Sequence, residues 1–135
     1  MLQLTKDSID LGINVRDAEA SLKFYRDTLG LEHVASIPLP GGGAGTMHRL
    51  LCGTSLIKIN AMDEPPAAEN PPGGPSTAIG VRYWTISVSN LEEIIEKCEA
   101  AGYNIPIPIR EARPGVTIAM VEDPDGNYFE FLRQS

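Results

Sequence analysis

Short stretches in which apolar and polar residues alternate recur along the chain. Alternation with a period of two is typical of β-strands that bury one face against a core. Two other stretches carry apolar residues at helical spacing. Tight turns at residues 52–55 and 123–126 are suited to join hairpins. The pattern predicts strands at residues 8–15, 31–37, 46–51, 56–62, 82–88, 103–109, 116–122 and 127–132.

Both predicted helices carry signals for where they begin and end. Asp17 and Asn90 are suited to cap the first turn, and Glu93 can close a capping box with Asn90. Gly30 and Gly102 are suited to the left-handed conformation just past a helix end. The apolar stripes are expected to be Ala18, Leu22, Tyr25 and Leu29 in the first helix, and Leu91, Ile94, Ile95 and Cys98 in the second.

The stretch from residue 63 to residue 80 carries five prolines and three glycines and is predicted to be a linker. On both sides of it the elements follow the order β-α-β-β-β. An offset of 72–73 residues aligns Val15 with Val88 and Gly30 with Gly102. The sequence therefore predicts an α+β fold with two tandem βαβββ modules, residues 1–62 and 81–135, in one domain. We expect a curved mixed sheet, a half-barrel cavity and helices on the outer face.

The alternation also predicts which strand residues face away from the helices. Side chains under a helix must be apolar, so the residues between them point to the other face. That face is polar in the first and last strand of each module. It is expected to carry Asp10, Lys58, Tyr83 and Glu130 at symmetry-related positions, and beside them Asn14, Asn60, Thr85 and Tyr128.

Composition and charge narrow the range of partners. The 135 residues amount to about one domain, and 42% hydrophobic residues suffice for a core. With 11 basic and 18 acidic residues the net charge is −7, which opposes nucleic acid and anionic membrane surfaces. The first residues lack the regions of a signal peptide, so a cytoplasmic protein is expected. Cys52 and Cys98 lack the spacing of a disulfide framework or a zinc site.

Two segments carry a resemblance to a known family. One is Ser-Leu-Lys-Phe-Tyr-Arg-Asp-Thr-Leu-Gly-Leu at residues 21–31, and the other is Asp-Pro-Asp-Gly-Asn at residues 123–127. Together with the two βαβββ modules, they resemble the vicinal oxygen chelate superfamily, which includes glyoxalase I, bleomycin-resistance proteins, extradiol dioxygenases and methylmalonyl-CoA epimerase. The resemblance covers nearly the whole chain. It is specific for the fold and says little about the activity.

The resemblance also implies where a metal would bind. In metal-dependent members the ligands resemble a set of His, Glu or Gln, His and Glu, from the first and last strand of each module. The matching positions here hold Asp10, Lys58, Tyr83 and Glu130, of which only Glu130 agrees. Because a lysine ammonium repels a divalent cation, we expect no metal and no cofactor. The alternative is a magnesium or manganese ion held by Asp10 and Glu130 with Tyr83.

The same four residues allow two metal-free interpretations. Lys58 can lie between Asp10 and Glu130 in an acid–base site, or the group can be the remnant of a lost site, with a salt bridge and a tyrosine filling the cavity. His48 could line the pocket as a general base, although a partly exposed strand histidine is commoner. Arg110 and Arg113 could hold a ligand carboxylate, although solvated arginine is the commoner case.

The favoured function is a metal-independent enzyme of the isomerase or lyase type that acts on a small organic molecule. Asp10 or Glu130 would accept a proton, Lys58 would stabilise an enolate or phenolate, and Tyr83 would donate a hydrogen bond. The alternatives are a binding protein of the bleomycin-resistance type, a metal-dependent lyase or dioxygenase with an atypical ligand set, and an accessory domain. Because open sheets expose their edges, a homodimer is expected. The residues expected to contact the substrate are Asn14, His48, Asn60, Thr85 and Tyr128.

Overall fold

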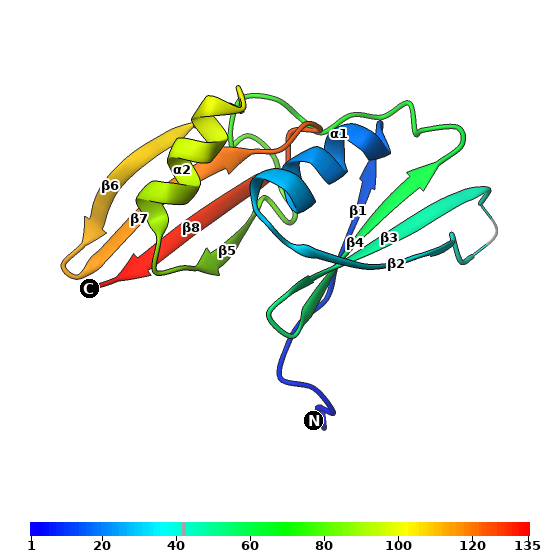
Figure 1. The fold of residues 1–135 in the computed structure, drawn as a ribbon, viewed down its shortest axis with the longest axis horizontal. Helices are drawn as coiled ribbons and strands as arrows, with labels where there is room; N and C mark the ends of the chain where they lie inside the picture. Colours follow the sequence, from blue (N-terminus) through cyan, green and yellow to red (C-terminus); the bar gives the residue numbers. More distant parts are fainter. Residues whose placement is uncertain (42) are drawn as a thin grey trace. The chain divides into compact units, whose positions relative to one another are not determined.

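The structure, a computed structural model, describes residues 1–41 and 43–135. It divides into two compact units, Met1–Ala67 and Ala68–Ser135. Each unit contains a four-stranded mixed sheet and its own helical segment (Figure 1). The predicted α+β class and the two βαβββ modules are thereby confirmed.

The two units share one strand order. In each, the first strand runs parallel to the last, and the remaining pairs are antiparallel, giving β1-β4-β3-β2 and β5-β8-β7-β6. The first unit consists of β1 (Leu11–Val15), α1 (Ala18–Leu22), a π-helical segment η1 (Lys23–Thr28), β2 (Glu32–Pro38), β3 (Gly45–Cys52) and β4 (Ser55–Met62). The second consists of β5 (Tyr83–Ser87), α2 (Leu91–Ala100), β6 (Ile107–Arg113), β7 (Val116–Glu122) and β8 (Tyr128–Gln134).

The first helix begins as predicted but changes its winding. The Asp17 carboxylate accepts hydrogen bonds from the backbone of Glu19 and Ala20 at 3.0 and 3.3 Å, which confirms the N-cap. After Leu22 the chain widens into η1. Leu22 and Tyr25 of the predicted stripe are buried as predicted, and in the wider turn the neighbouring Phe24 is buried as well.

The second helix confirms its predicted limits and corrects its cap. Gly102 has a φ of +87° just past the last turn, as a left-handed helix end requires. The Asn90 side chain caps no backbone N–H and instead donates to the Glu93 carboxylate at 3.0 Å, so no capping box forms. Leu91, Ile95 and Cys98 are buried as predicted, and burial raises the pKa of Cys98 to about 11.

Two strands are shorter at their start than predicted, because backbone or side-chain bonds divert the chain. Ser8 and Ile9 lie outside β1, and the carboxylate of Asp10 takes the N–H of Leu56 in place of a ladder bond. Tyr103 donates its N–H to the carbonyl of Cys98 at the helix end, so β6 starts only at Ile107.

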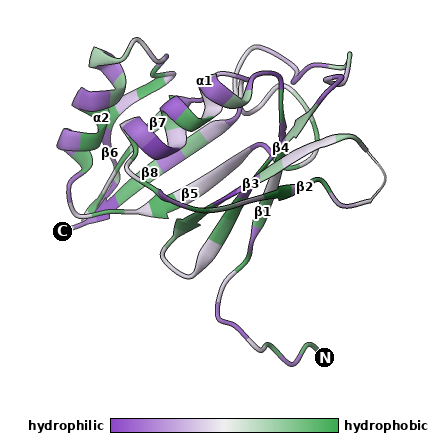
Figure 2. Cartoon of the chain, turned by 45° about the vertical axis from the view of Figure 1, so that its right-hand side comes forward, coloured by the Kyte–Doolittle hydropathy of each residue, from purple (hydrophilic) through white to green (hydrophobic). Residues whose placement is uncertain are grey.

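Each sheet buries one face under its helix. The alternate residues Ile13 and Val15 in β1 and Ile57 and Ile59 in β4 are at most 6% exposed, and Phe129 and Phe131 in β8 are equally buried. In Figure 2 the helices show hydrophilic and hydrophobic sides accordingly. This confirms the predicted phase, so the alternate residues face away from the helices.

The segment between β4 and β5 forms no helix or strand, and its second half is attached to the second unit. The Asn70 side chain donates to the backbone of Asp125 at 2.9 Å, and Arg82 donates to the carbonyls of Gly74 and Pro75. In the part of the chain that the structure describes, no helix is long and apolar enough to cross a membrane.

Candidate functional site

A row of four residues crosses the face of the first sheet that points away from α1. The strand register places Gly12 beside Lys58, Lys58 beside Arg49, and Arg49 beside Ala35. We call these four residues the cationic row. It consists of two adjacent long cations with one small residue on each side.

The two cations of the row form no salt bridge in the described part of their own unit. Neither Lys58 nor Arg49 is salt-bridged within residues 1–41 and 43–67. Both side chains are half-buried, and the Nε–H of Arg49 is shielded from solvent without an acceptor. A buried charged donor without an acceptor is costly, so this Nε–H favours an acceptor from outside the described residues of the unit.

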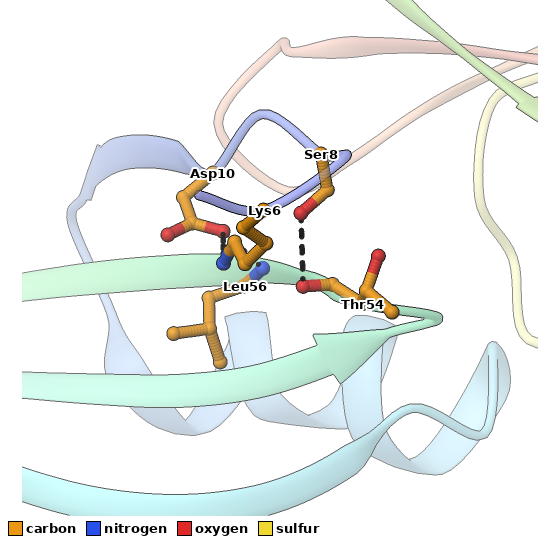
Figure 3. A network of polar contacts seen from close by, with 5 residues as sticks. All are labelled: Lys6, Ser8, Asp10, Thr54 and Leu56. Atoms are coloured by element: carbon orange, nitrogen blue, oxygen red, sulfur yellow. Dashed lines mark hydrogen bonds and ion pairs between the residues drawn. The ribbon is translucent and has the colours of Figure 1, made fainter. Parts of the chain in front are cut away.

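Asp10, which we expected beside Lys58, has a different partner (Figure 3). Its Oδ1 accepts the ammonium of Lys6 at 2.7 Å and the backbone N–H of Leu56 at 2.8 Å. Lys6 and then Leu56 are the main causes of the lowered pKa of Asp10, and Lys58 acts only as a weaker, more distant charge. The carboxylate therefore serves to anchor the chain before β1 and is a weak base.

The equivalent row of the second sheet carries one acid. Its residues are Thr85, Glu130, Met120 and Ile107, in the same strand order, and we call them the acidic row. The Thr85 hydroxyl donates to Glu130 Oε1 at 2.8 Å. The predicted substrate contact Thr85 is thus directly beside Glu130, while Tyr83 lies two residues earlier on β5 and is 49% exposed.

The hydroxyl of Tyr128 is not available to a substrate. It lies level with Tyr83, but it is only 4% exposed, and its oxygen accepts the backbone N–H of Gly74 at 2.9 Å. This contact corrects the expectation of an accessible Tyr128. Its role in the structure is to hold the proline-rich segment against the second sheet.

Asn14 and Asn60 are brought together as expected. They are paired across β1 and β4, and the Asn60 amide donates to Asn14 Oδ1 at 3.4 Å. They lie one row away from the cationic row on the same face, because residues two apart on a strand share a face. They add a patch of neutral polar groups beside the cations.

His48 lies on the opposite face from Lys58, which corrects its predicted place in the pocket. The register sets His48 beside Ile59, a fully buried residue on the helix side of the sheet. Burial and the nearby His33 lower the pKa of His48, with a smaller contribution from Arg26 that Glu19 opposes.

A short hydrogen-bonded chain surrounds His48. His33 Nε2 and His48 Nδ1 each lie 2.9 Å from the hydroxyl oxygen of Ser36. His33 Nε2 also contacts the carbonyl of Ala35 at 3.1 Å, so this nitrogen must be the donor. With His33 as donor, the Ser36 hydroxyl keeps its own proton for a hydrogen bond to His48 Nδ1 when that nitrogen is unprotonated. The bulge between His33 and Ala35 brings His33 and Ser36 to one face.

Arg49 is the residue that the sequence analysis missed, although the signal was present. The hairpin turn predicted at residues 52–55 pairs Cys52 with Ser55, and counting back along both strands sets Arg49 beside Lys58. The same count sets His48 beside Ile59. The positions that the family resemblance implies all lie on the first and last strands of each module, whereas Arg49 lies on β3.

The described residues do not suit a divalent metal at the positions that the resemblance implies. Lys58 and Arg49 place two positive charges there, and Asp10 is bound to Lys6 and Leu56. Within residues 1–41 and 43–135, no three His, Cys, Asp or Glu side chains are grouped closely enough to hold an ion.

Comparisons with known proteins agree with the fold. The profile of the Glyoxalase/Bleomycin resistance protein/Dioxygenase superfamily matches residues 8–131. No functionally curated protein matches the chain significantly.

Several solved structures resemble the whole chain. A glyoxalase family protein from Enterococcus faecalis is 25% identical, with a TM-score of 0.71 over 95% of this chain and 98% of its own. A glyoxalase family protein from Bacillus cereus has a TM-score of 0.79 at 13% identity, over 98% of this chain and 99% of its own. The glyoxalase I of Leishmania major, described as trypanothione-dependent, has a TM-score of 0.73 at 22% identity, over 96% and 87%.

Proposed function

Because the chain belongs to the Glyoxalase/Bleomycin resistance protein/Dioxygenase superfamily, we propose that it binds a small organic molecule on the polar faces of its sheets. We propose further that it acts on this molecule as an isomerase or lyase without a metal ion. The observation that carries the proposal is the placement of Glu130 in the acidic row, where the Thr85 hydroxyl beside it donates to its carboxylate at 2.8 Å.

The second sheet by itself offers the groups that a proton transfer needs. Glu130 is half-buried and accepts the Thr85 hydroxyl, so its carboxylate is oriented and can take a proton from a carbon acid. The exposed Tyr83 hydroxyl, on β5 in the same unit, donates a hydrogen bond to the negative oxygen of the resulting enolate. With a β,γ-unsaturated carbonyl compound as substrate, the enolate is a dienolate, and return of the proton from Glu130 to its γ-carbon moves the double bond and completes an isomerisation. Asp10 is less suited as the base, because its pKa is lowered, mainly by Lys6.

Proton exchange tests this proposal without knowledge of the natural substrate. Carbonyl compounds with an acidic C–H, including pyruvate and phenylpyruvate, are incubated with the protein in D2O with a metal chelator, and exchange is followed by NMR. We expect Glu130→Gln to slow exchange by about 100-fold or more, the usual contribution of a positioned general base.

Glu96→Gln is the matched control, because it removes one carboxylate from the exposed side of α2 in the same unit. It is expected to leave exchange unchanged. Equal exchange in Glu130→Gln and the native protein would contradict the enzyme proposal. Compounds that bind without any exchange would instead indicate the alternative, a binding protein of the sequestering type.

Assembly as a homodimer remains part of the proposal. Within its own unit, each sheet ends in two edge strands, β1 and β2 or β5 and β6. Exposed strand edges favour pairing with a further chain. Light scattering at micromolar concentration is expected to give twice the 14.6 kDa of one chain, and a value near 14.6 kDa would count against the dimer.

A further inference from the structure

We propose that the cationic row binds the carboxylate group of a small organic acid, so that the ligand of this protein is an organic anion. The inference rests on the proposed function, since it assigns the chemical class of the molecule bound on the same face. It is carried by Gly12, Lys58, Arg49 and Ala35, which lie side by side across the four strands of the first sheet.

Two like charges at directly opposed positions destabilise a sheet. Lys58 and Arg49 are opposed in the antiparallel ladder of β3 and β4, where Cβ atoms lie about 5 Å apart. A purely structural role would be better filled by a cation and an acid at these two places. The pair therefore stores a repulsion that an anion between the two side chains relieves.

The nearby acids do not supply that anion. Asp10 uses one oxygen for both Lys6 and the N–H of Leu56. Glu32 lies at the edge of the sheet, one row away, opposite Leu51. The buried Nε–H of Arg49 accordingly has no acceptor within the described part of the unit, and a ligand oxygen can satisfy it after a rotation of the side chain.

Small residues leave room beside the cations. A Cβ added at Gly12 would have a single neighbour within 4 Å, the Asn60 amide nitrogen at 3.9 Å. Gly12 also has no positive φ, so neither packing nor backbone conformation requires glycine there. A glycine in a strand interior that packing does not require is typical of a site where a ligand approaches the backbone closely. Ala35 leaves similar room beside Arg49.

The rows on either side favour an organic carboxylate over a free inorganic anion. A guanidinium matches the two oxygens of a carboxylate, and the ammonium of Lys58 adds a second charge. Leu51 and Leu56 form a half-buried apolar strip on one side of the cationic row, suited to the body of the ligand. The amides of Asn14 and Asn60 border the other side.

Titrations followed by amide NMR test the inference with probes of defined charge. Benzoate is compared with its neutral counterpart benzamide and with inorganic phosphate, each added to the full chain at up to about 20 mM, a range that detects millimolar affinity. We expect benzoate to shift the amide signals of Gly12 and Lys58, and benzamide to bind at least about tenfold more weakly. Phosphate is expected to bind more weakly than benzoate.

Three variants locate the binding. Arg49→Met and Lys58→Met are each expected to weaken benzoate binding by about tenfold or more, through loss of one charge-assisted contact. Gly12→Leu is expected to block binding by filling the space beside Lys58 while both charges remain. Lys23→Met is the matched control, because it removes one exposed positive charge from η1, on the helix side of the same unit.

The outcomes separate this inference from the proposed function. Absence of benzoate binding, equal binding of benzamide, tighter binding of phosphate, or equal losses in Lys23→Met and Arg49→Met would each overturn the carboxylate site. If the native protein catalyses no proton exchange but still binds benzoate at the cationic row, only the enzyme proposal is contradicted. Exchange that persists without any carboxylate binding would contradict only this inference.

Discussion

The cationic row and the acidic row occupy equivalent places in the two units, but they differ in whether the charged side chains have a partner within their own sheet. In the acidic row the only charge, Glu130, accepts a hydrogen bond from Thr85 beside it on the neighbouring strand. In the cationic row Lys58 and Arg49 are beside each other, and the place that matches Thr85 holds Gly12. The charge of the acidic row therefore has a hydrogen-bond partner within its own sheet, whereas the charges of the cationic row have no such partner in the described part of theirs.

This difference shows how a duplicated fold can separate stability from function. The backbone order is the same in both sheets, so the helix-side residues maintain two similar cores. The residues facing away from the helices contribute little to those cores and can diverge. A row whose charged side chains have no ion-pair or hydrogen-bond partner in their own sheet is the better candidate for binding a ligand.

The largest expected effect separates the two cores. Phe24 and Phe129 are at most 1% exposed, one in each unit, and truncating either to alanine should cost about 3–5 kcal/mol of unfolding free energy. Hydrogen exchange should show the loss of protection concentrated in the unit that carries the substitution. Phe24→Leu, which keeps most of the volume, should cost far less. Equal loss in both units after either substitution would contradict separate cores.

A smaller change in unfolding free energy, this time a gain, is expected if the repulsion between Lys58 and Arg49 destabilises the first sheet. Lys58→Met, measured without ligand, should stabilise the protein by about 0.2–1 kcal/mol, because it removes one of two opposed like charges. Glu130→Gln should bring no such gain, since its partner Thr85 is a neutral donor. Chemical denaturation measures both. Destabilisation by Lys58→Met would show that the cation is satisfied within the fold.

The smallest expected effect concerns pH and the helix side of the first sheet. Burial, followed by His33, lowers the pKa of His48 below its ordinary value of 6.5. Between these two values the unfolded chain binds a proton that the folded chain does not. The contribution of His48 is therefore present above pH 6.5 and is lost as the pH falls through the lowered pKa.

Two variants check this assignment. His48→Asn keeps an acceptor for Ser36 but cannot titrate, so the slope of stability against pH near 6 should become shallower. His33→Gln keeps a donor and removes the neighbouring charge, so NMR titration should show a higher pKa for His48. An unchanged slope in His48→Asn would contradict the assignment.

Several features of the site could be predicted from local sequence, and others could not. The alternation of residues predicted which face Lys58 and Glu130 occupy, and the two-residue turn after Cys52 implied the partner of each residue in β3. The contact of Lys6 with Asp10 was unpredictable, because it joins a segment without regular structure to the start of β1. The contact of Gly74 with Tyr128 joins residues 54 positions apart.

The sequence by itself determined the duplication, the order of the elements along the chain and the faces of the strands, because helix caps, tight turns and a period of two depend on residues close together in the chain. Only the tertiary structure decided which polar groups are satisfied. The bulge that directs His33 and Ser36 toward His48, and the anchoring of Asp10 by Leu56, depend on packing between strands distant in sequence. That Lys58 and Arg49 form no salt bridge within the described residues of the first unit was decided there too, because ion pairing depends on where every neighbouring strand is placed.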